Sequence, residues 1–337
     1  MRYPEPQQLY PELPDPIRRG GGFIPQTRHF NFFDGVQEYV QLAQPVTLSG
    51  DFEIEFDALS RSASAPNMVL GNSADNNNNG IFINANDVFA RDSTGNTTFT
   101  DGDVFTSNIL RHVRIVKIGT SVTIFVNGSQ SGSGTSSAPF VLDLLCARKS
   151  IVEFVLDGII ANVRITDNGT LIHNWSINDN SNVIADSVGS NNGTLVNPSG
   201  GWGLFDKQSD GDYLGQELVV NGGFDSPDNW TLTDPTITIS GGVAEFSSTP
   251  AFNNITQDIG FSYNTEYRTN INISQYSQGS IRIQLEGVQG TNRVSDGTFQ
   301  EDLITAASGA TRLFIRNTTV STIGVDSISV KQLLRVA

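Results

Sequence analysis

Strict alternation of apolar and charged residues constrains this chain more than any other feature. In residues 51–58, DFEIEFDA, apolar side chains at Phe52, Ile54, Phe56 and Ala58 alternate with Asp51, Glu53, Glu55 and Asp57. A period of two is typical of a strand with one buried and one wet face. The same period returns at 112–118, 122–126 and 159–165, and no window of about 11 residues repeats apolar residues at helical spacing. The sequence therefore predicts an all-β chain.

Length and turn signals divide the chain into parts. At 337 residues it exceeds one ordinary domain and suits two of about 100–200 residues each. Beyond residue 215 short strands return about every 8–12 residues between Gly, Asn and Asp turns, which is typical of a sandwich or jelly roll. We expect two antiparallel jelly-roll β-sandwiches, at 26–214 and 215–337, preceded by an extended N-terminal arm at 1–25.

The expected arm has its own composition. Five prolines lie between Pro4 and Pro16, followed by Arg18, Arg19 and three glycines. Proline fixes φ and removes a backbone donor, so the segment is expected to be extended, on a glycine hinge. Two interpretations stay open: a disordered tail, or an arm that docks on a neighbouring subunit. The apolar anchors of a docking arm would be Tyr3, Leu9, Tyr10, Leu13 and Ile17.

Charge and cysteine content exclude several classes of partner. The chain has 20 Lys and Arg against 35 Asp and Glu, a net charge of −15, and no cationic run. Nucleic acids and anionic membrane surfaces are bound through clustered cations, so neither is an expected partner. Cys146 is the only cysteine, which rules out an intrachain disulfide and a thiolate metal cluster. We expect no signal peptide, because the N-terminus lacks an uninterrupted apolar core. We expect no membrane insertion, because no apolar stretch of about 18 residues occurs.

Several motifs of the first half carry a family likeness. They are Phe33-Asp34-Gly35, the hairpin from His112 to Gly128, Leu156-Asp157-Gly158, Leu171 to Trp175, and Ala185-Asp186-Ser187 with Asn192 to Leu195. Through them residues 28–214 resemble the concanavalin A-like (laminin G-like) jelly-roll modules common in bacteriophage structural proteins and secreted adhesins. The resemblance implies architecture far more than activity, because such folds host many functions.

The second half resembles a different module. Its motifs are Asn221 to Asp225, Trp230, Ser240 to Val243 and Asp326 to Val330. Through them residues 217–333 look like a galactose-binding-like jelly roll of the carbohydrate-binding-module type. Two such modules behind a proline-rich arm look like a phage virion protein. A chain assembled in the reducing host cytoplasm relies on packing rather than on disulfides, which suits a single cysteine.

Three carboxylates on one strand raise the alternative of an enzyme. Glu53, Glu55 and Asp57 project from the same face, and glycoside hydrolases of concanavalin A-like architecture use paired carboxylates on an acidic strand. The order Glu-Ile-Glu-Phe-Asp departs from that family's usual Glu-x-Asp-x-x-Glu, and a solvated strand face is the preferred interpretation. We expect no enzyme and no catalytic residue. A polysaccharide-active enzyme, or its targeting subunit, stays as the alternative.

Two further kinds of site follow from the second resemblance. Asp225 and Asp326 would converge if first and last strands are neighbours, and the resemblance then implies a structural Ca²⁺ as an alternative to ordinary turn aspartates. No other cofactor is expected. A sugar needs an exposed aromatic platform beside hydrogen-bonding side chains. The candidates are Trp202, Tyr263 and Tyr276, whereas Trp175 and Trp230 are predicted to pack.

These features favour a non-enzymatic virion structural protein, either a capsid decoration or a tail or tail-fibre component. Residues 1–25 would anchor it to other virion proteins. Many copies, as a homo-oligomer, would present both jelly rolls for adhesion to a cell-surface glycan or for subunit bridging. A capsid or tail cement without glycan binding is the second alternative.

Overall fold

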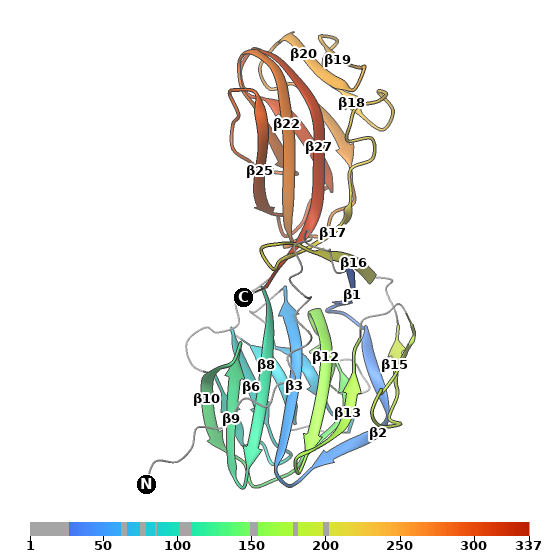
Figure 1. The fold of residues 1–337 in the computed structure, drawn as a ribbon, viewed down its shortest axis with the longest axis vertical. Coiled ribbons are helices and arrows are strands. Elements are labelled where there is room, and N and C mark those ends of the chain that lie inside the picture. Colours follow the sequence, from blue (N-terminus) through green and yellow to red (C-terminus); the bar gives the residue numbers. More distant parts are fainter. Residues whose placement is uncertain are drawn as a thin grey trace, which may run out of the picture.

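The computed structural model describes residues 27–61, 66–74, 79–84, 86–100, 109–148, 154–177, 181–197 and 202–336. Within these ranges every regular element is a β-strand, so the predicted all-β class is confirmed. Two β-sandwiches lie end to end along the long axis of the molecule (Figure 1). No helix in the described part of the chain has the length and apolar character needed to cross a membrane. The predicted arm and its five anchor residues lie outside the described residues.

The N-terminal sandwich consists of two facing antiparallel sheets. The first has the order β10 (Ser129–Thr135), β9 (Ser121–Val126), β8 (Ile109–Ile118), β3 (Phe52–Ser60), β12 (Asp157–Asp167) and β1 (Thr27–Asp34), with β13 (Thr170–Trp175) beside β12. The second has the order β14 (Val183–Ile184), β15 (Gly193–Val196), β2 (Tyr39–Leu48), β11 (Phe140–Leu145), β4 (Asn67–Gly71), β5 (Gly80–Asn84), β6 (Asp87–Arg91) and β7 (Thr97–Phe99). The apolar side chains on the inner side of β3, including those of Ile54 and Phe56, are fully buried between the two sheets.

The C-terminal sandwich has one sheet built around its longest strand. That sheet contains β19 (Ile237–Ser240), β20 (Val243–Thr249), β27 (Ser321–Val336), β22 (Glu266–Gln278) and β25 (Gly297–Ile304). The facing five-stranded sheet has the order β18 (Thr231–Leu232), β21 (Asn254–Asp258), β26 (Arg312–Asn317), β23 (Ile281–Leu285) and β24 (Val288–Gln289). Phe224 and Phe246 are fully buried in the core between the two sheets.

A continuous sheet joins the two sandwiches. Strand β1 pairs with β16 (Trp202–Lys207), β16 with β17 (Tyr213–Glu217), and β17 with β27. The end of β27 then pairs in parallel with the start of β8. A third apolar cluster lies at this junction and contains Phe30, Leu59, Leu110, Ile159, Ala161, Phe205, Tyr213 and Leu334. The predicted boundary at 214/215 thus falls inside a strand that is shared between the modules.

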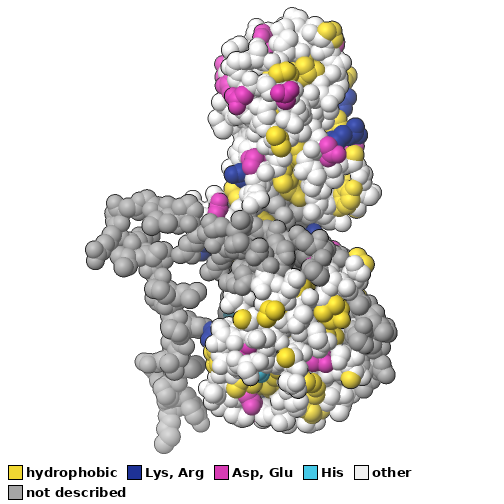
Figure 2. All heavy atoms as spheres, turned by 90° about the vertical axis from the view of Figure 1, so that its right-hand side faces the viewer, with side chains coloured by type: hydrophobic (Ala, Val, Ile, Leu, Met, Phe, Trp, Pro, Cys, Tyr) yellow, Lys and Arg dark blue, Asp and Glu magenta, His cyan; other side chains and the backbone are white. Residues whose placement is uncertain are grey.

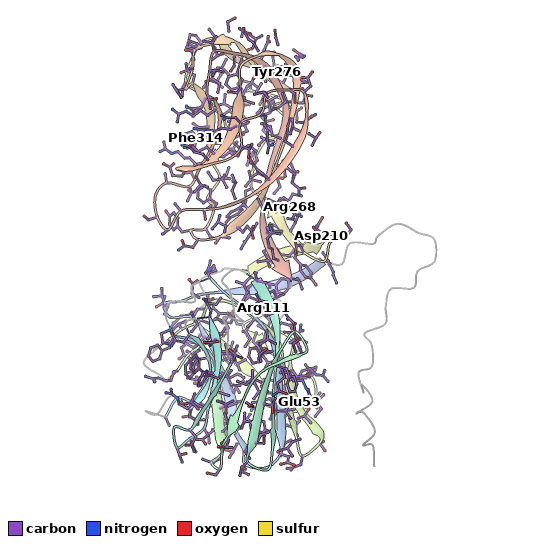
Figure 3. All side chains as sticks on the ribbon, turned by 90° about the vertical axis from the view of Figure 1, so that its left-hand side faces the viewer. Glu53, Arg111, Asp210, Arg268, Tyr276 and Phe314 are labelled. Atoms are coloured by element: carbon purple, nitrogen blue, oxygen red, sulfur yellow. The ribbon has the colours of Figure 1, made fainter. Side chains whose placement is uncertain are left out.

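Charged side chains reinforce the same junction. The guanidinium of Arg268 on β22 lies 3.0 Å from Asp302 and 3.3 Å from Asp210, and Arg335 lies 2.7 Å from Asp302. Figure 3 shows Arg268 and Asp210 between the two sandwiches. Elsewhere, acidic side chains are dispersed over the face drawn in Figure 2 rather than gathered in one patch.

Candidate functional site

The outer surface of the five-stranded sheet carries polar, aromatic and arginine side chains. Along β23, Ile281 and Ile283 point into the core, so Arg282 and Gln284 point outward. Along β26, Leu313 and Ile315 are buried, so Phe314 and Arg316 share that outward side. We define the five-stranded face as Asn254, Thr256, Arg282, Gln284, Phe314 and Arg316.

Strand register gathers these six side chains around one aromatic ring. Phe314 is paired with Thr256 on β21 and with Gln284 on β23. Arg316 is paired in the same way with Asn254 and Arg282. Directly opposite Cβ atoms of antiparallel strands lie about 4.5–5.5 Å apart. Phe314 is half-buried and belongs to the five-stranded sheet, whereas Tyr276 belongs to β22 of the facing sheet (Figure 3).

Four polar atoms of this face are buried without a hydrogen-bond partner. They are Nε of Arg282, Nε of Arg316, Oδ1 of Asn254 and Oε1 of Gln284. A buried polar atom left unpaired costs about 1–3 kcal/mol. By contrast, Arg312 on the same sheet is paired with Glu286 at 3.0 Å, and its guanidinium lies 5.3 Å from the ring centroid of Phe314. The face therefore combines an aromatic ring with amide and guanidinium groups that are not fully hydrogen-bonded within the protein.

The predicted aromatic platforms are elsewhere. Tyr263 is 40% exposed, in the loop before β22, and its hydroxyl donates to the carbonyl of Gly309. Tyr276 packs against the core, and its hydroxyl donates to the carbonyl of Gly279 at 3.1 Å. Trp202 begins β16, but its side chain lies outside what the structure describes. Whether these three bind sugar stays a prediction.

The other two tryptophans pack, as predicted. Trp175 is fully buried and donates its indole N–H to the carbonyl of Asn191 at 2.8 Å. Trp230 is 8% exposed and donates to the carbonyl of Asn221 at 3.1 Å. Both therefore have structural roles in their modules.

The predicted calcium ligands have separate surroundings. Asp326 on β27 accepts hydrogen bonds from Asn272 and Ser274 on β22. Asp225 is exposed in the loop after β17, with its backbone N–H donating to Asn221. Among the described residues no group of three or more His, Cys, Asp or Glu side chains is placed to hold a metal. A Ca²⁺ ion stays a prediction of the sequence, and a melting temperature unchanged by chelator would contradict it.

The acidic side chains of β3 are paired with cationic side chains on neighbouring strands. Figure 3 labels one of these acidic residues, Glu53. Glu53 lies 2.6 Å from Arg114, and Asp57 lies 2.9 Å from His112. The hydrogen bond from His112 and the charge of Arg164 hold the pKa of Glu55 below its usual value. A glycosidase general acid requires a raised pKa. The arrangement is that of an ion-paired strand face.

His112 makes the stability of this strand pH-dependent. Hydrogen bonds with Asp57 and Glu55 raise the pKa of His112 to about 9. The folded state binds this proton more tightly than the unfolded chain, whose histidine pKa is about 6.5. The stabilisation is therefore complete below about pH 6.5 and is lost as the pH rises through about 9. We expect the melting temperature to fall over this range, and to fall less in His112→Gln. An NMR titration midpoint near 6.5 for His112 would contradict this.

A second aromatic surface lies on the N-terminal sandwich. Phe82, Phe89 and Phe99 are cross-strand neighbours on β5, β6 and β7, with ring centroids 4.9 Å and 5.6 Å apart. Phe99 is 53% exposed and lines a groove of about 640 Å³ with Gln130 and Ser131 of β10. Among the described side chains that line this groove, none has a buried unpartnered polar atom. The five-stranded face is therefore the better candidate for a binding site.

The sequence predicted β23 and β26 but did not single out their outward side chains as a candidate site. A hint of an exposed aromatic residue is present in residues 312–316, RLFIR. Buried Leu and Ile alternate there with outward positions, and Phe314 occupies one of the outward positions. The register that places Phe314 beside Gln284, and Arg316 beside Arg282, comes only from the structure.

Comparisons with known proteins give fold likenesses only. No protein family and no curated protein matches the sequence. A Bacteroides ovatus protein with a provisional carbohydrate-binding assignment aligns over 55% of this chain and 61% of its own, with 16% identity and a TM-score of 0.41. The LG4-5 domains of the mouse laminin alpha1 chain align over 92% of this chain and 82% of their own, with 10% identity and a TM-score of 0.35. The tandem CBM22 domains of Paenibacillus barcinonensis Xyn10C align over 86% and 82%, with 10% identity and a TM-score of 0.27. A function therefore has to be argued from this chain's own residues.

Proposed function

We propose that this chain is a non-enzymatic carbohydrate-binding protein that holds a glycan on its five-stranded face. The observation that carries the proposal is the set of unpartnered amide and guanidinium atoms around Phe314. An aromatic ring stacks on the apolar face of a sugar, while amides and guanidinium groups hydrogen-bond its hydroxyls. The buried atoms themselves are out of a ligand's reach, but the amide nitrogens of Asn254 and Gln284 and the terminal guanidinium nitrogens of Arg282 and Arg316 have no hydrogen-bond partner among the described residues and are not buried. A bound sugar would supply partners for these accessible ends of the same side chains.

The ion pairs of β3 support binding without catalysis. Each of Glu53, Glu55 and Asp57 faces a cationic side chain, and the lowered pKa of Glu55 opposes a role as general acid. A glycan array with the intact chain tests the proposal, together with a reducing-sugar assay on every glycan bound. We expect retention without released reducing ends. Released sugar would favour the polysaccharide-active enzyme, and a blank array would favour a cement protein without glycan binding.

The biological setting that we propose is the surface of a bacteriophage particle. Residues 1–25 would anchor the chain to other virion proteins of the capsid or tail, and many copies would convert weak glycan contacts into firm attachment. Support comes from the proline-rich sequence of the arm and from the single cysteine.

Deleting residues 2–22 is expected to abolish incorporation into particles. Both sandwiches are expected to stay folded, because their cores comprise residues between 33 and 195 and between 219 and 330. Incorporation is measured on purified particles by immunoblot, and folding by circular dichroism of the truncated chain. Full incorporation of the truncated chain would reject the anchoring role.

A further inference from the structure

Two arginines of the five-stranded face differ from their neighbours in the same module. The other described arginines there each lie near a carboxylate: Arg268 at 3.0 Å from Asp302, Arg293 at 3.3 Å from Glu301, Arg312 at 3.0 Å from Glu286 and Arg335 at 2.8 Å from Glu266. Within the described part of the chain, Arg282 and Arg316 have no carboxylate within 4.0 Å. The nearest acidic position on β21, Asp258, is paired in register with Arg312 instead.

These two arginines also lie directly opposite each other. Arg282 on β23 and Arg316 on β26 are register partners on the same outward side. Like charges placed opposite each other across two strands are destabilising. The chain has 35 acidic residues and a net charge of −15, yet none of the described ones neutralises this pair. Such an arrangement is stabilised when an anion binds between the two guanidinium groups.

We infer that the five-stranded face selects an anionic glycan, whose carboxylate or sulfate group is held by Arg282 and Arg316. This inference rests on the proposed function and specifies the substrate class. A guanidinium group presents a planar fork of donors that matches carboxylate and sulfate oxygens. Neither guanidinium has a hydrogen-bond or ion-pair partner among the described residues. Because each Nε is buried, the terminal N–H groups are the donors that each arginine can give to the anion.

The spacing of the side chains suits one sugar residue. Phe314 precedes Arg316 by two positions on β26, which is about 7 Å along a strand. A ring stacked on Phe314 therefore places an acidic substituent within reach of the arginine pair. The guanidinium of Arg316 lies 5.6 Å from the ring centroid of Phe252, which is 60% exposed. That contact orients Arg316 and extends the aromatic surface beside the anion.

Titration calorimetry of the intact chain tests the inference with three oligosaccharide series. These are oligogalacturonates with carboxylates, sulfated dextrans and neutral dextrans. We expect at least one anionic series to bind more tightly than the neutral one. Arg282→Gln and Arg316→Gln are each expected to weaken that binding about tenfold to a hundredfold, as expected for the loss of a hydrogen bond between charged groups. Arg114→Gln, at an arginine of the other sandwich that is ion-paired with Glu53 at 2.6 Å, is the matched control and is expected to leave affinity unchanged.

Salt and heat provide two further readouts. Raising the ionic strength should weaken anionic binding by the wild-type chain and have little effect on the double variant, because salt screens the charges. The melting temperature of Arg282→Gln should not fall, because the substitution removes a like-charge repulsion.

Three outcomes would overturn the inference. One is a clear loss of thermal stability in either single variant, which would make the arginines structural. A second outcome is that neutral dextran binds as tightly as both anionic series and that Phe314→Ala abolishes binding of all three. In that case the proposed function stands and only the anionic selection fails. Failure of the wild-type chain to bind any carbohydrate would instead reject the proposed function, and the inference with it.

Discussion

Replacing Asp186 with alanine is expected to lower the free energy of unfolding of the chain by about 3–5 kcal/mol. The Asp186 carboxylate is fully buried and lies 2.6 Å from Nδ1 of His173. It also accepts backbone N–H groups of Asn174, Gly189, Val188 and Asn191 at 3.0–3.3 Å. The alanine variant leaves several buried donors without an acceptor at once, and this desolvation cost explains the size of the effect.

Calorimetry of the intact chain measures the loss, and pH provides a second readout. Hydrogen bonds from the backbone of Asn174 and from His173 lower the pKa of Asp186 to about 2, despite its burial. A carboxylate with a depressed pKa stabilises the fold above its unfolded pKa of about 3.9, and this contribution is lost as the pH falls through about 2. Asp186→Ala should lack that acid dependence. Asp225→Ala, at an exposed loop position, is the control, and an equal effect of both substitutions would contradict the account.

Replacing Arg268 with alanine is expected to cost about 3–5 kcal/mol, the range found when one partner of a buried ion pair is removed. The Arg268 side chain is only 10% exposed and lies within 3.5 Å of Asp302, Asp210 and Asp212. Without it, Asp212 and Asp302 keep Arg335 at 3.7 Å and 2.7 Å, whereas Asp210 has no other cation within 4.0 Å among the described residues. Because Asp210 and Asp212 belong to the β16–β17 hairpin, the loss should weaken the junction between the sandwiches.

The expected readout is a change in cooperativity. The wild-type chain, with one sheet running through both sandwiches, should unfold in a single calorimetric transition, whereas Arg268→Ala should show two. Arg312→Ala removes an ion pair that is half exposed, and such surface pairs contribute about 1 kcal/mol or less. Two transitions in the wild-type chain, or one in Arg268→Ala with an unchanged midpoint, would contradict a coupled junction.

Local patterns predicted much of the fold. The alternation over 51–58 identified β3 and its buried face, and the turn at Gly119 identified the β8–β9 hairpin. Strands β23 and β26 were predicted for the same reason. In each case the signal lies within about ten residues, which is the range over which period-two burial can be recognised.

Long-range pairing was not predictable from these patterns. The sequence places a boundary at 214/215, but β17 pairs with the distant β27, and the end of β27 pairs with β8. The five-stranded face was not identified from the sequence for a similar reason. Phe314, Gln284 and Arg282 are separated along the chain, and only strand register makes them neighbours. The predicted aromatic platforms, Trp202, Tyr263 and Tyr276, are at other positions and stay predictions.

The most direct test of glycan binding by the five-stranded face compares Phe314→Ala with Phe99→Ala. Both substitutions remove a partly or largely exposed phenyl ring, but Phe99 belongs to the groove of the other sandwich. For the tightest glycan found on the array, calorimetry should show an affinity about tenfold to a hundredfold weaker in Phe314→Ala, since burying a phenyl ring contributes about 1.5–3 kcal/mol. Phe99→Ala should bind like the wild-type chain. Undiminished affinity in Phe314→Ala, with binding lost in Phe99→Ala, would contradict the account.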